Sequence, residues 1–193
     1  MTSAALAQSF PILDFETYLD IESNAVNKHE FYHGIVYAMA GSTNAHLILC
    51  SAAQFQLSRL LAKRNCYVLA EARVVSPNSA ASFYADVSVH CDQVLPPKGL
   101  ATTSPTIVVE VLSPSTRKFD LNAKRKEYFR IPSLSHYLLI DSETPSVLLY
   151  TRDANQTWPK DPQSFTGPKA AIPLTALKIN LKLKDLYRQT GLL

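Results

Sequence analysis

The chain has 193 residues, of which 47% are hydrophobic, and its 19 lysines and arginines outnumber its 16 aspartates and glutamates, giving a formal charge of +3. This length predicts a single domain over residues 1–193, and the small positive charge permits nucleic-acid binding without predicting it. The five glycines stand too far apart for a phosphate-binding loop, a dinucleotide fingerprint or the nucleophile turn of a serine hydrolase.

The first elements along the chain are a hairpin and a helix. An apolar and aromatic segment over 30–40 predicts two short strands that turn at 33–34. Polar residues at 42–44 then offer N-caps for a helix whose apolar face includes Leu47 and Phe55.

Strand-like and helical patterns continue beyond this helix. The predicted strands cover 67–75, 83–91, 106–112, 136–141 and 147–150, a helix covers 118–130, and an alternating strand with one wet face covers 177–184. Proline and glycine mark 92–105 and 153–173 as irregular. Because the second stretch is unusually long for a structureless loop, it is interpreted as a flap, a partner surface or a decoration.

The order of these elements predicts the fold. A helix before three strands, with a second helix and a strand after them, predicts an α/β protein with a mixed sheet between helices. We therefore expect a three-layer α-β-β-β-α-β core over about residues 28–150, with an N-terminal hairpin and a C-terminal strand extension.

The cysteines and the apolar stretches predict where the protein resides. Cys50, Cys66 and Cys91 are odd in number, widely spaced and without a zinc-knuckle pattern, which predicts reduced cysteines in an intracellular protein. Residues 1–13 lack the pattern of a secretory signal, and polar side chains interrupt the uncharged stretch 31–58. We expect a soluble, cytoplasmic protein without a membrane partner.

Glu110 is the most unusual residue of the predicted core, because it lies inside the apolar run 107–112. An unpaired carboxylate is costly to bury, so Glu110 needs a cation or a hydrogen-bonding partner. Asp86 is a candidate companion, on the polar face of a strand whose Ala85, Val87 and Val89 point to the core. If the two strands pair, Asp86 and Glu110 face one another and predict a site for Mg²⁺ or Mn²⁺.

The helix that follows Glu110 adds a cation to this picture. Asp120, Lys124 and Tyr128 are spaced by four residues and would form one stripe along a helix. A lysine in that stripe can orient a water molecule or stabilise negative charge on a phosphate during attack.

These residues also resemble a known family, the Uma-type restriction-endonuclease-like proteins of the PD-(D/E)XK nuclease superfamily. The resemblance covers about residues 28–150, and the segments that carry it are Tyr84–Val87, Val109–Thr116, Asp120 with Lys124 and Tyr128, Tyr137–Asp141, and Glu30–Gly41 followed by His46.

The resemblance implies metal-dependent hydrolysis of DNA phosphodiester bonds. Asp86 would stand for the aspartate of the family's Pro-Asp motif and Glu110 for the acid of its E-x-K motif, together holding the metal. Ala85 replaces the usual proline, and Leu112 replaces the usual lysine. The catalytic lysine would then be recruited from the next helix as Lys124.

Alternative interpretations of the site remain open from the sequence. Glu110 is instead a structural acid if it pairs with Arg117 or Lys124, and Lys124 is instead a surface lysine if it faces solvent. Residues with weaker accessory roles are Glu30, His46, Ser113, Asp120, which is also a candidate N-cap, and Tyr128, which is also a candidate core residue.

At the level of function, the alternative to a nuclease is a catalytically decayed nuclease-fold module that binds nucleic acid or protein. A nuclease that cuts both strands of DNA would suit a homodimer, because two sites match two strands.

Overall fold

The computed structural model describes residues 12–39 and 41–193, so most of the predicted non-signal segment 1–13 and Ala40 of the predicted hairpin lie outside the described residues. The helices are α1 (Phe15–Asn24), α2 (Asn44–Leu61), α3 (Arg117–Phe119), α4 (Arg125–Tyr128) and α5 (Leu183–Tyr187), with a π-helical turn at Asp120–Lys124. The strands are β1 (His29–Tyr32), β2 (Ile35–Ala38), β3 (Cys66–Val75), β4 (Ala81–Cys91), β5 (Ile107–Leu112), β6 (His136–Asp141), β7 (Ser146–Thr151), β8 (Gln163–Thr166), β9 (Ala171–Leu174) and β10 (Ile179–Lys182).

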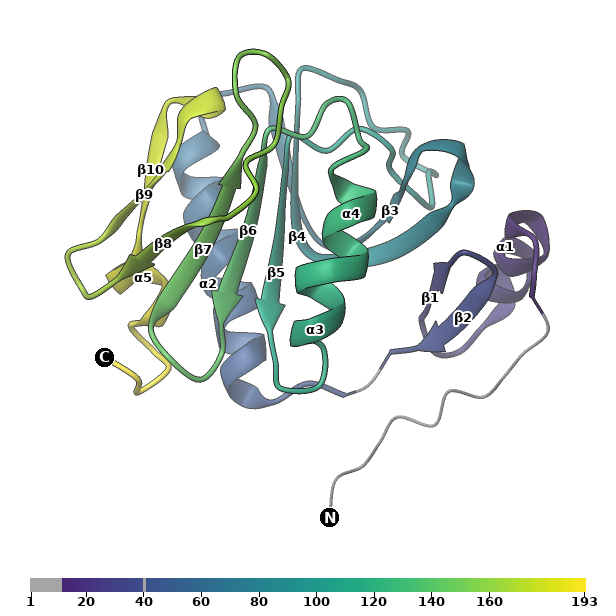
Figure 1. The fold of residues 1–193 in the computed structure, drawn as a ribbon, viewed down its shortest axis with the longest axis horizontal. Coiled ribbons are helices and arrows are strands. Elements are labelled where there is room, and N and C mark those ends of the chain that lie inside the picture. The colour runs from purple at the N-terminus through teal and green to yellow at the C-terminus, as the bar shows by residue number, and fades with distance from the viewer. Residues whose placement is uncertain (1–11, 40) are drawn as a thin grey trace.

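An eight-stranded mixed sheet forms the centre of the molecule, in the order β2-β1-β4-β5-β6-β7-β8, with β3 paired to β4 as well. Only β5 and β6 run parallel; the other pairs of this sheet are antiparallel. Helix α2 lies on one face of the sheet and the helical segment from α3 to α4 lies on the other (Figure 1). The predicted three-layer order is therefore confirmed.

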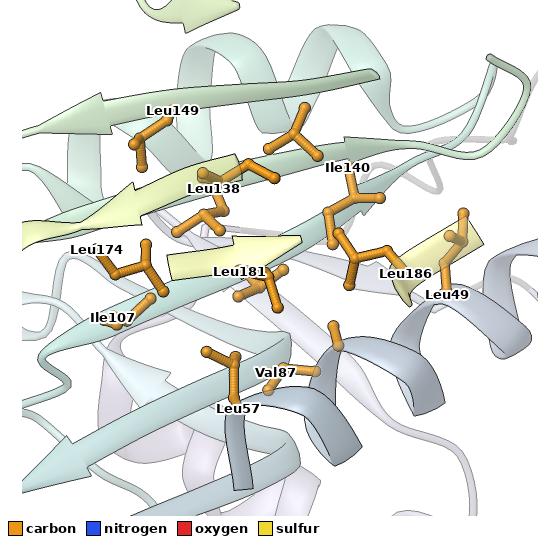
Figure 2. Packing of buried hydrophobic residues seen from close by; sticks show 14 of the residues in the cluster. Leu49, Leu57, Val87, Ile107, Leu138, Ile140, Leu149, Leu174, Leu181 and Leu186 are labelled. Carbon is orange, nitrogen blue, oxygen red and sulfur yellow. The ribbon is translucent and has the colours of Figure 1, made fainter. Parts of the chain in front are cut away.

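The face covered by α2 holds the larger aliphatic core. Leu49 and Leu57 of α2 pack against Val87, Ile107 and Leu138 of the sheet (Figure 2). Thr43 caps the helix, as the 42–44 pattern predicted, because its side chain accepts a hydrogen bond from the His46 amide. The predicted apolar face is wrong in part, since Leu47 and Phe55 are exposed.

The opposite face is aromatic. Phe83, Tyr128, Tyr137 and Tyr150 are buried there, and Tyr128 packs edge-on against Phe83 with ring centroids 5.6 Å apart. The predicted role of Tyr128 in core packing is therefore confirmed. This aromatic layer fixes the position of the α3–α4 segment over the sheet.

Strand β4 carries two different partners along one edge. Ser82 pairs with both Phe31 of β1 and Val75 of β3, so β1 and β3 lie on opposite sides of β4. Further along, Val87 to Val89 pair with β5 on the side away from β3. Strands β1 and β5 therefore share one edge of β4 and leave a gap between them, which we call the β1/β5 gap. The backbone edge of residues 83–86 borders this gap.

Several predictions about the ends of the chain needed correction. Helix α1 was not predicted, although Asp14 caps it with a hydrogen bond from the Thr17 amide. The stretch 153–173, which was predicted to be irregular, contains β8, which extends the main sheet, and the start of β9. The predicted strand 177–184 is confirmed only over β10 (Ile179–Lys182), which pairs with β9.

The cysteine prediction is also corrected. Cys66 and Cys91 face one another across β3 and β4 and form a disulfide, which leaves Cys50 as the free thiol of the described chain. The wide spacing in sequence hid the pair because strand pairing brings the two residues together. Within residues 12–39 and 41–193, each helix is too short or too polar to span a lipid bilayer.

Candidate active site

A buried lysine lies at the centre of the candidate site. The Lys124 ammonium is 2.9 Å from Glu30 Oε1, 3.3 Å from Glu110 Oε1 and 3.5 Å from Asp120 Oδ1. Burial would lower the pKa of Lys124, but the charges of Glu110, Glu30 and Asp120 raise it well above its usual value. Lys124 therefore stays protonated, and the interpretation of Lys124 as a surface lysine is wrong.

A π-helical turn places this lysine. One continuous helical segment runs from Arg117 to Tyr128, and its π-helical turn spans Asp120–Lys124, where the Arg125 amide donates to the Asp120 carbonyl. Such single π-helical turns inside α-helices are frequent at functional sites. Asp120 lies inside the helical segment, so its predicted role as an N-cap is wrong; Thr116 holds the cap position of α3.

Glu110 occupies the middle strand of the sheet beneath this helix. Its Oε1 accepts hydrogen bonds from Tyr128 Oη at 2.8 Å and from Lys124 Nζ at 3.3 Å. No hydrogen bond joins its second oxygen, Oε2, to a described residue. Burial raises the pKa of Glu110 well above its usual range, the Lys124 charge opposes this, and the charges of Asp86, Asp120 and Glu30 add to it.

Asp86 lies in the β1/β5 gap, where β4 changes partners. Its Oδ2 accepts a hydrogen bond of 2.6 Å from the Val111 amide, which fixes the carboxylate beside the residue that follows Glu110. The same oxygen lies 3.4 Å from His46 Nε2 on α2. Burial alone would lower the pKa of His46, but the hydrogen bond to Asp86 and the Asp86 charge raise it overall.

The predicted alternation of β4 is wrong at this point. Ala85 belongs to the aromatic core between the sheet and α4. Val87 and Val89 belong to the aliphatic core on the opposite face, between the sheet and α2. The reversal occurs at Asp86, opposite Glu71, which has a left-handed backbone (φ 48°) that interrupts the regular pleat of β3. Asp86 therefore contacts α2 while Glu110 contacts the α3–α4 segment.

The electrostatic balance of the site favours a bound cation. Three carboxylates, those of Glu30, Glu110 and Asp120, lie around Lys124. A fourth, Asp86, contacts His46, and its charge also acts on Glu110. Asp120 Oδ1 is buried and makes no hydrogen bond with a described residue, and its only ion pair among these residues is the long one of 3.5 Å to Lys124. Four carboxylates beside one lysine and one histidine fit a hard divalent cation, because magnesium prefers oxygen ligands.

The accessory candidates divide into two groups. Glu30 joins the site from β1, where its Oε1 also accepts the Tyr84 amide of β4 at 3.1 Å. Ser113 does not join it; its hydroxyl bonds with Ser115 and Thr116 at the start of the helical segment. Arg117 pairs with Asp141 and not with Glu110.

Cys50 is a neighbour of the site that the sequence reasoning missed. Its Sγ lies 3.4 Å from His46 Nδ1. The signal was the spacing of His46 and Cys50, since residues four apart lie on one face of a helix.

Comparison with known proteins assigns the chain to a family. The family model "Uma2: Putative restriction endonuclease" matches residues 15–184. The chain belongs to the Uma2 family. Two uncharacterized proteins of Synechocystis sp. are also similar, one with 32% identity over 77% of this chain and 79% of its own length, the other with 33% identity over 87% and 96%.

A solved structure supports the fold of this Uma2 protein. A crystal structure described as "a putative nuclease belonging to DUF820" from Anabaena variabilis superposes with a TM-score of 0.75 at 16% identity, over 92% of this chain and 99% of that one. The Uma2 protein thus has a restriction-endonuclease-like α/β fold, and membership of its family supports a nuclease function.

Proposed function

We propose that this Uma2 protein is a metal-dependent endonuclease that hydrolyses phosphodiester bonds in DNA. The observation that carries the proposal is the buried Lys124 ammonium, which lies among Glu30, Glu110 and Asp120 beside the β1/β5 gap that holds Asp86. Lys124 lies within the residues that the Uma2 family model matches. A catalytic role explains a lysine buried among acids better than a contribution to stability alone does.

Asp86 and Glu110 are the proposed holders of the metal, Mg²⁺ or Mn²⁺. Each carboxylate is anchored by one oxygen, Asp86 through the Val111 amide and Glu110 through Tyr128 and Lys124. Anchoring of this kind fixes ligands before an ion arrives, which lowers the entropic cost of binding. A bound divalent cation supplies charge stabilisation at the phosphate and acidifies the attacking water.

We propose that Lys124 donates a hydrogen bond to the attacking water or to a phosphate oxygen on which negative charge develops. Its three carboxylate neighbours hold the ammonium in place and keep it protonated, so it acts as a fixed positive charge and not as a base. Tyr128 positions Glu110 by its hydrogen bond to Oε1. Glu30 and Asp120 position Lys124.

Cleavage of supercoiled plasmid in the presence of Mg²⁺ tests this assignment. We expect Asp86→Asn, Glu110→Gln and Lys124→Gln each to lower the rate at least about 100-fold, and EDTA to abolish cleavage. Lys126→Gln, which changes an exposed lysine two residues from Lys124, is the matched control and should keep full activity. A wild-type protein that binds DNA but leaves it intact under all metals tried would favour the decayed module.

We further propose that two copies act together on duplex DNA. Paired sites match the two strands, so a homodimer should release linear plasmid without first accumulating the nicked circle. Light scattering during gel filtration measures the mass in solution. A monomeric mass, with nicked circles as the first product at every protein concentration, would contradict the dimer.

A further inference from the structure

A second group of ligating side chains lies next to the proposed hard-cation position. His46 and Cys50 come from successive turns of α2, and Asp86 comes from β4 across the interface between helix and sheet. One ligand atom from each of the three residues lies within 4.8 Å of the other two. His46 Nε2 is 3.4 Å from Asp86 Oδ2, and His46 Nδ1 is 3.4 Å from Cys50 Sγ.

These distances are close to those of a tetrahedral metal site. Two ligands each about 2.1 Å from one ion at a tetrahedral angle stand about 3.4 Å apart. The two distances involve different nitrogens of His46, so a change in side-chain torsions is needed to bring one nitrogen and the other two donors, now within 4.8 Å of one another, onto a single ion. All three side chains are partly buried, so the position is shielded yet open to an entering ion.

The chemistry of the donors differs from that of the hard-cation position. Glu110, Asp120 and Glu30 offer only oxygen, which suits magnesium, whereas nitrogen, sulfur and oxygen together suit zinc and cobalt. Cys50 is available for this role because Cys66 and Cys91 are bonded to each other. Binding would release the Cys50 thiol proton to solvent, leaving a thiolate on the metal.

We propose that His46, Cys50 and Asp86 form a binding site for a divalent cation of the zinc class, adjacent to the position formed by Asp86 and Glu110. Three protein ligands leave a fourth tetrahedral position for water. The inference goes beyond the proposed nuclease activity and does not depend on it, although Asp86 is shared by the two positions.

Cobalt binding to the metal-stripped 193-residue chain tests the site without measuring DNA cleavage. A thiolate bound to Co²⁺ produces a charge-transfer absorption band in the near ultraviolet. We expect this band to saturate at one Co²⁺ per chain and to disappear when Zn²⁺ is added in equal amount. Absence of the band in the wild type would overturn the proposal.

Variants assign the ligands. We expect Cys50→Ser to remove the band. His46→Gln should weaken Co²⁺ binding at least about 10-fold, since the loss of a residue that only hydrogen-bonds to a metal ligand already costs that much affinity. The double variant Cys66→Ser/Cys91→Ser should keep the band, and so should Glu110→Gln, which alters only the neighbouring position. A band that persists in Cys50→Ser would overturn the proposal.

A second measurement uses the wild type alone and therefore tests the site even if the variants do not fold. Zn²⁺ should protect Cys50 of the wild type from alkylation, as measured by mass spectrometry of the peptide that contains it. Equal alkylation with and without Zn²⁺ would also contradict the site, because a thiolate bound to zinc is a poorer nucleophile than a free one.

Discussion

At the scale of single residues, the energetics of Lys124 dominate the candidate site. A lysine buried with three acids has lost most of its hydration. Only the attraction of the acids offsets the free energy that this loss costs. Removing the ammonium leaves Glu30, Glu110 and Asp120 close together without a cation. The lysine is therefore needed for folding as well as for the proposed chemistry, at least in the absence of metal.

Replacing Lys124 with glutamine should therefore destabilise the metal-free protein. We expect Lys124→Gln to lower the free energy of unfolding by about 3 kcal/mol, because three buried carboxylates lose the ammonium with which they pair. Unfolding in urea, followed by circular dichroism, measures this. Lys126→Gln should change the value by less than about 0.5 kcal/mol, since its side chain is exposed. Equal stability of the two variants would contradict the account.

Some of the site was readable from single residues and some was not. Glu110 was conspicuous because a lone acid in an apolar run needs a partner. The four-residue spacing predicted that Asp120, Lys124 and Tyr128 share one stripe, and the pairing of Glu110 with Lys124 was left as an alternative to a bound metal ion. The contact of Asp86 with His46 and Cys50 was not readable, because it joins α2 to β4 through packing. No local pattern encodes that packing.

At the scale of elements, the π-helical turn sets the geometry of the site. It brings Asp120 and Lys124 to the same side of the segment above Glu110. Deleting the exposed residue Asn122 should convert the turn to regular α-helix and change the spacing of Asp120 and Lys124 from four residues to three. Residues three apart still share a helix face, but the shorter and narrower segment would shift Asp120 and Lys124 relative to each other and to Glu110.

We expect the Asn122 deletion to fold but to lose proposed cleavage at least about 100-fold, because catalysis tolerates little displacement of its groups. Circular dichroism checks the fold, and the plasmid assay checks activity. The control is Asn122→Ala, which removes only the side-chain hydrogen bond to the Lys118 carbonyl and should stay active. Full activity in the deletion would show that the turn is not required.

His136 links β6 to the chain that leads into β10 and makes stability depend on pH. It is fully buried, and its Nε2 accepts a hydrogen bond from the Ala176 amide, so the ring must be neutral. Burial lowers the pKa of His136 from 6.5 to about 4. A depressed histidine pKa means that stability is complete above pH 6.5 and is lost as the pH falls towards 4.

His136→Gln should reduce this acid sensitivity, since glutamine can accept the Ala176 hydrogen bond without titrating. We expect the pH dependence of the unfolding free energy between pH 6.5 and 4 to become shallower by up to about 1.4 kcal/mol per pH unit. His90, whose pKa burial also lowers to about 4, maintains part of the slope. Identical slopes in the wild type and the variant would contradict the role of His136.

The strands of the core were predicted well because long apolar runs such as 107–112 and 136–141 fit buried strands. The reversal at Asp86 was not predicted, because it depends on the left-handed backbone of Glu71 in the neighbouring strand. The stretch 153–173 was misread for a related reason. Its strand β8 is short and exposed, and it forms by pairing with β7 and not through an apolar pattern of its own.

At the scale of the whole molecule, the Cys66–Cys91 disulfide joins the two longest strands at the end farthest along β4 from the hairpin. It closes a loop with a sequence separation of 25 residues. A crosslink over such a loop limits the freedom of the unfolded chain, which is the main source of its stabilising effect. The proposed catalytic residues do not contact either cysteine.

The double variant Cys66→Ser/Cys91→Ser should therefore lose stability but keep proposed activity. From the loop length we expect the free energy of unfolding to fall by about 3 kcal/mol, with plasmid cleavage at 25 °C unchanged within about twofold. Urea unfolding and the plasmid assay measure the two effects. Thiol titration of the unfolded, unreduced wild type adds a direct count, since only Cys50 is free. Three reactive thiols, together with equal stability of the wild type and the variant, would restore the reduced state predicted from the cysteine spacing.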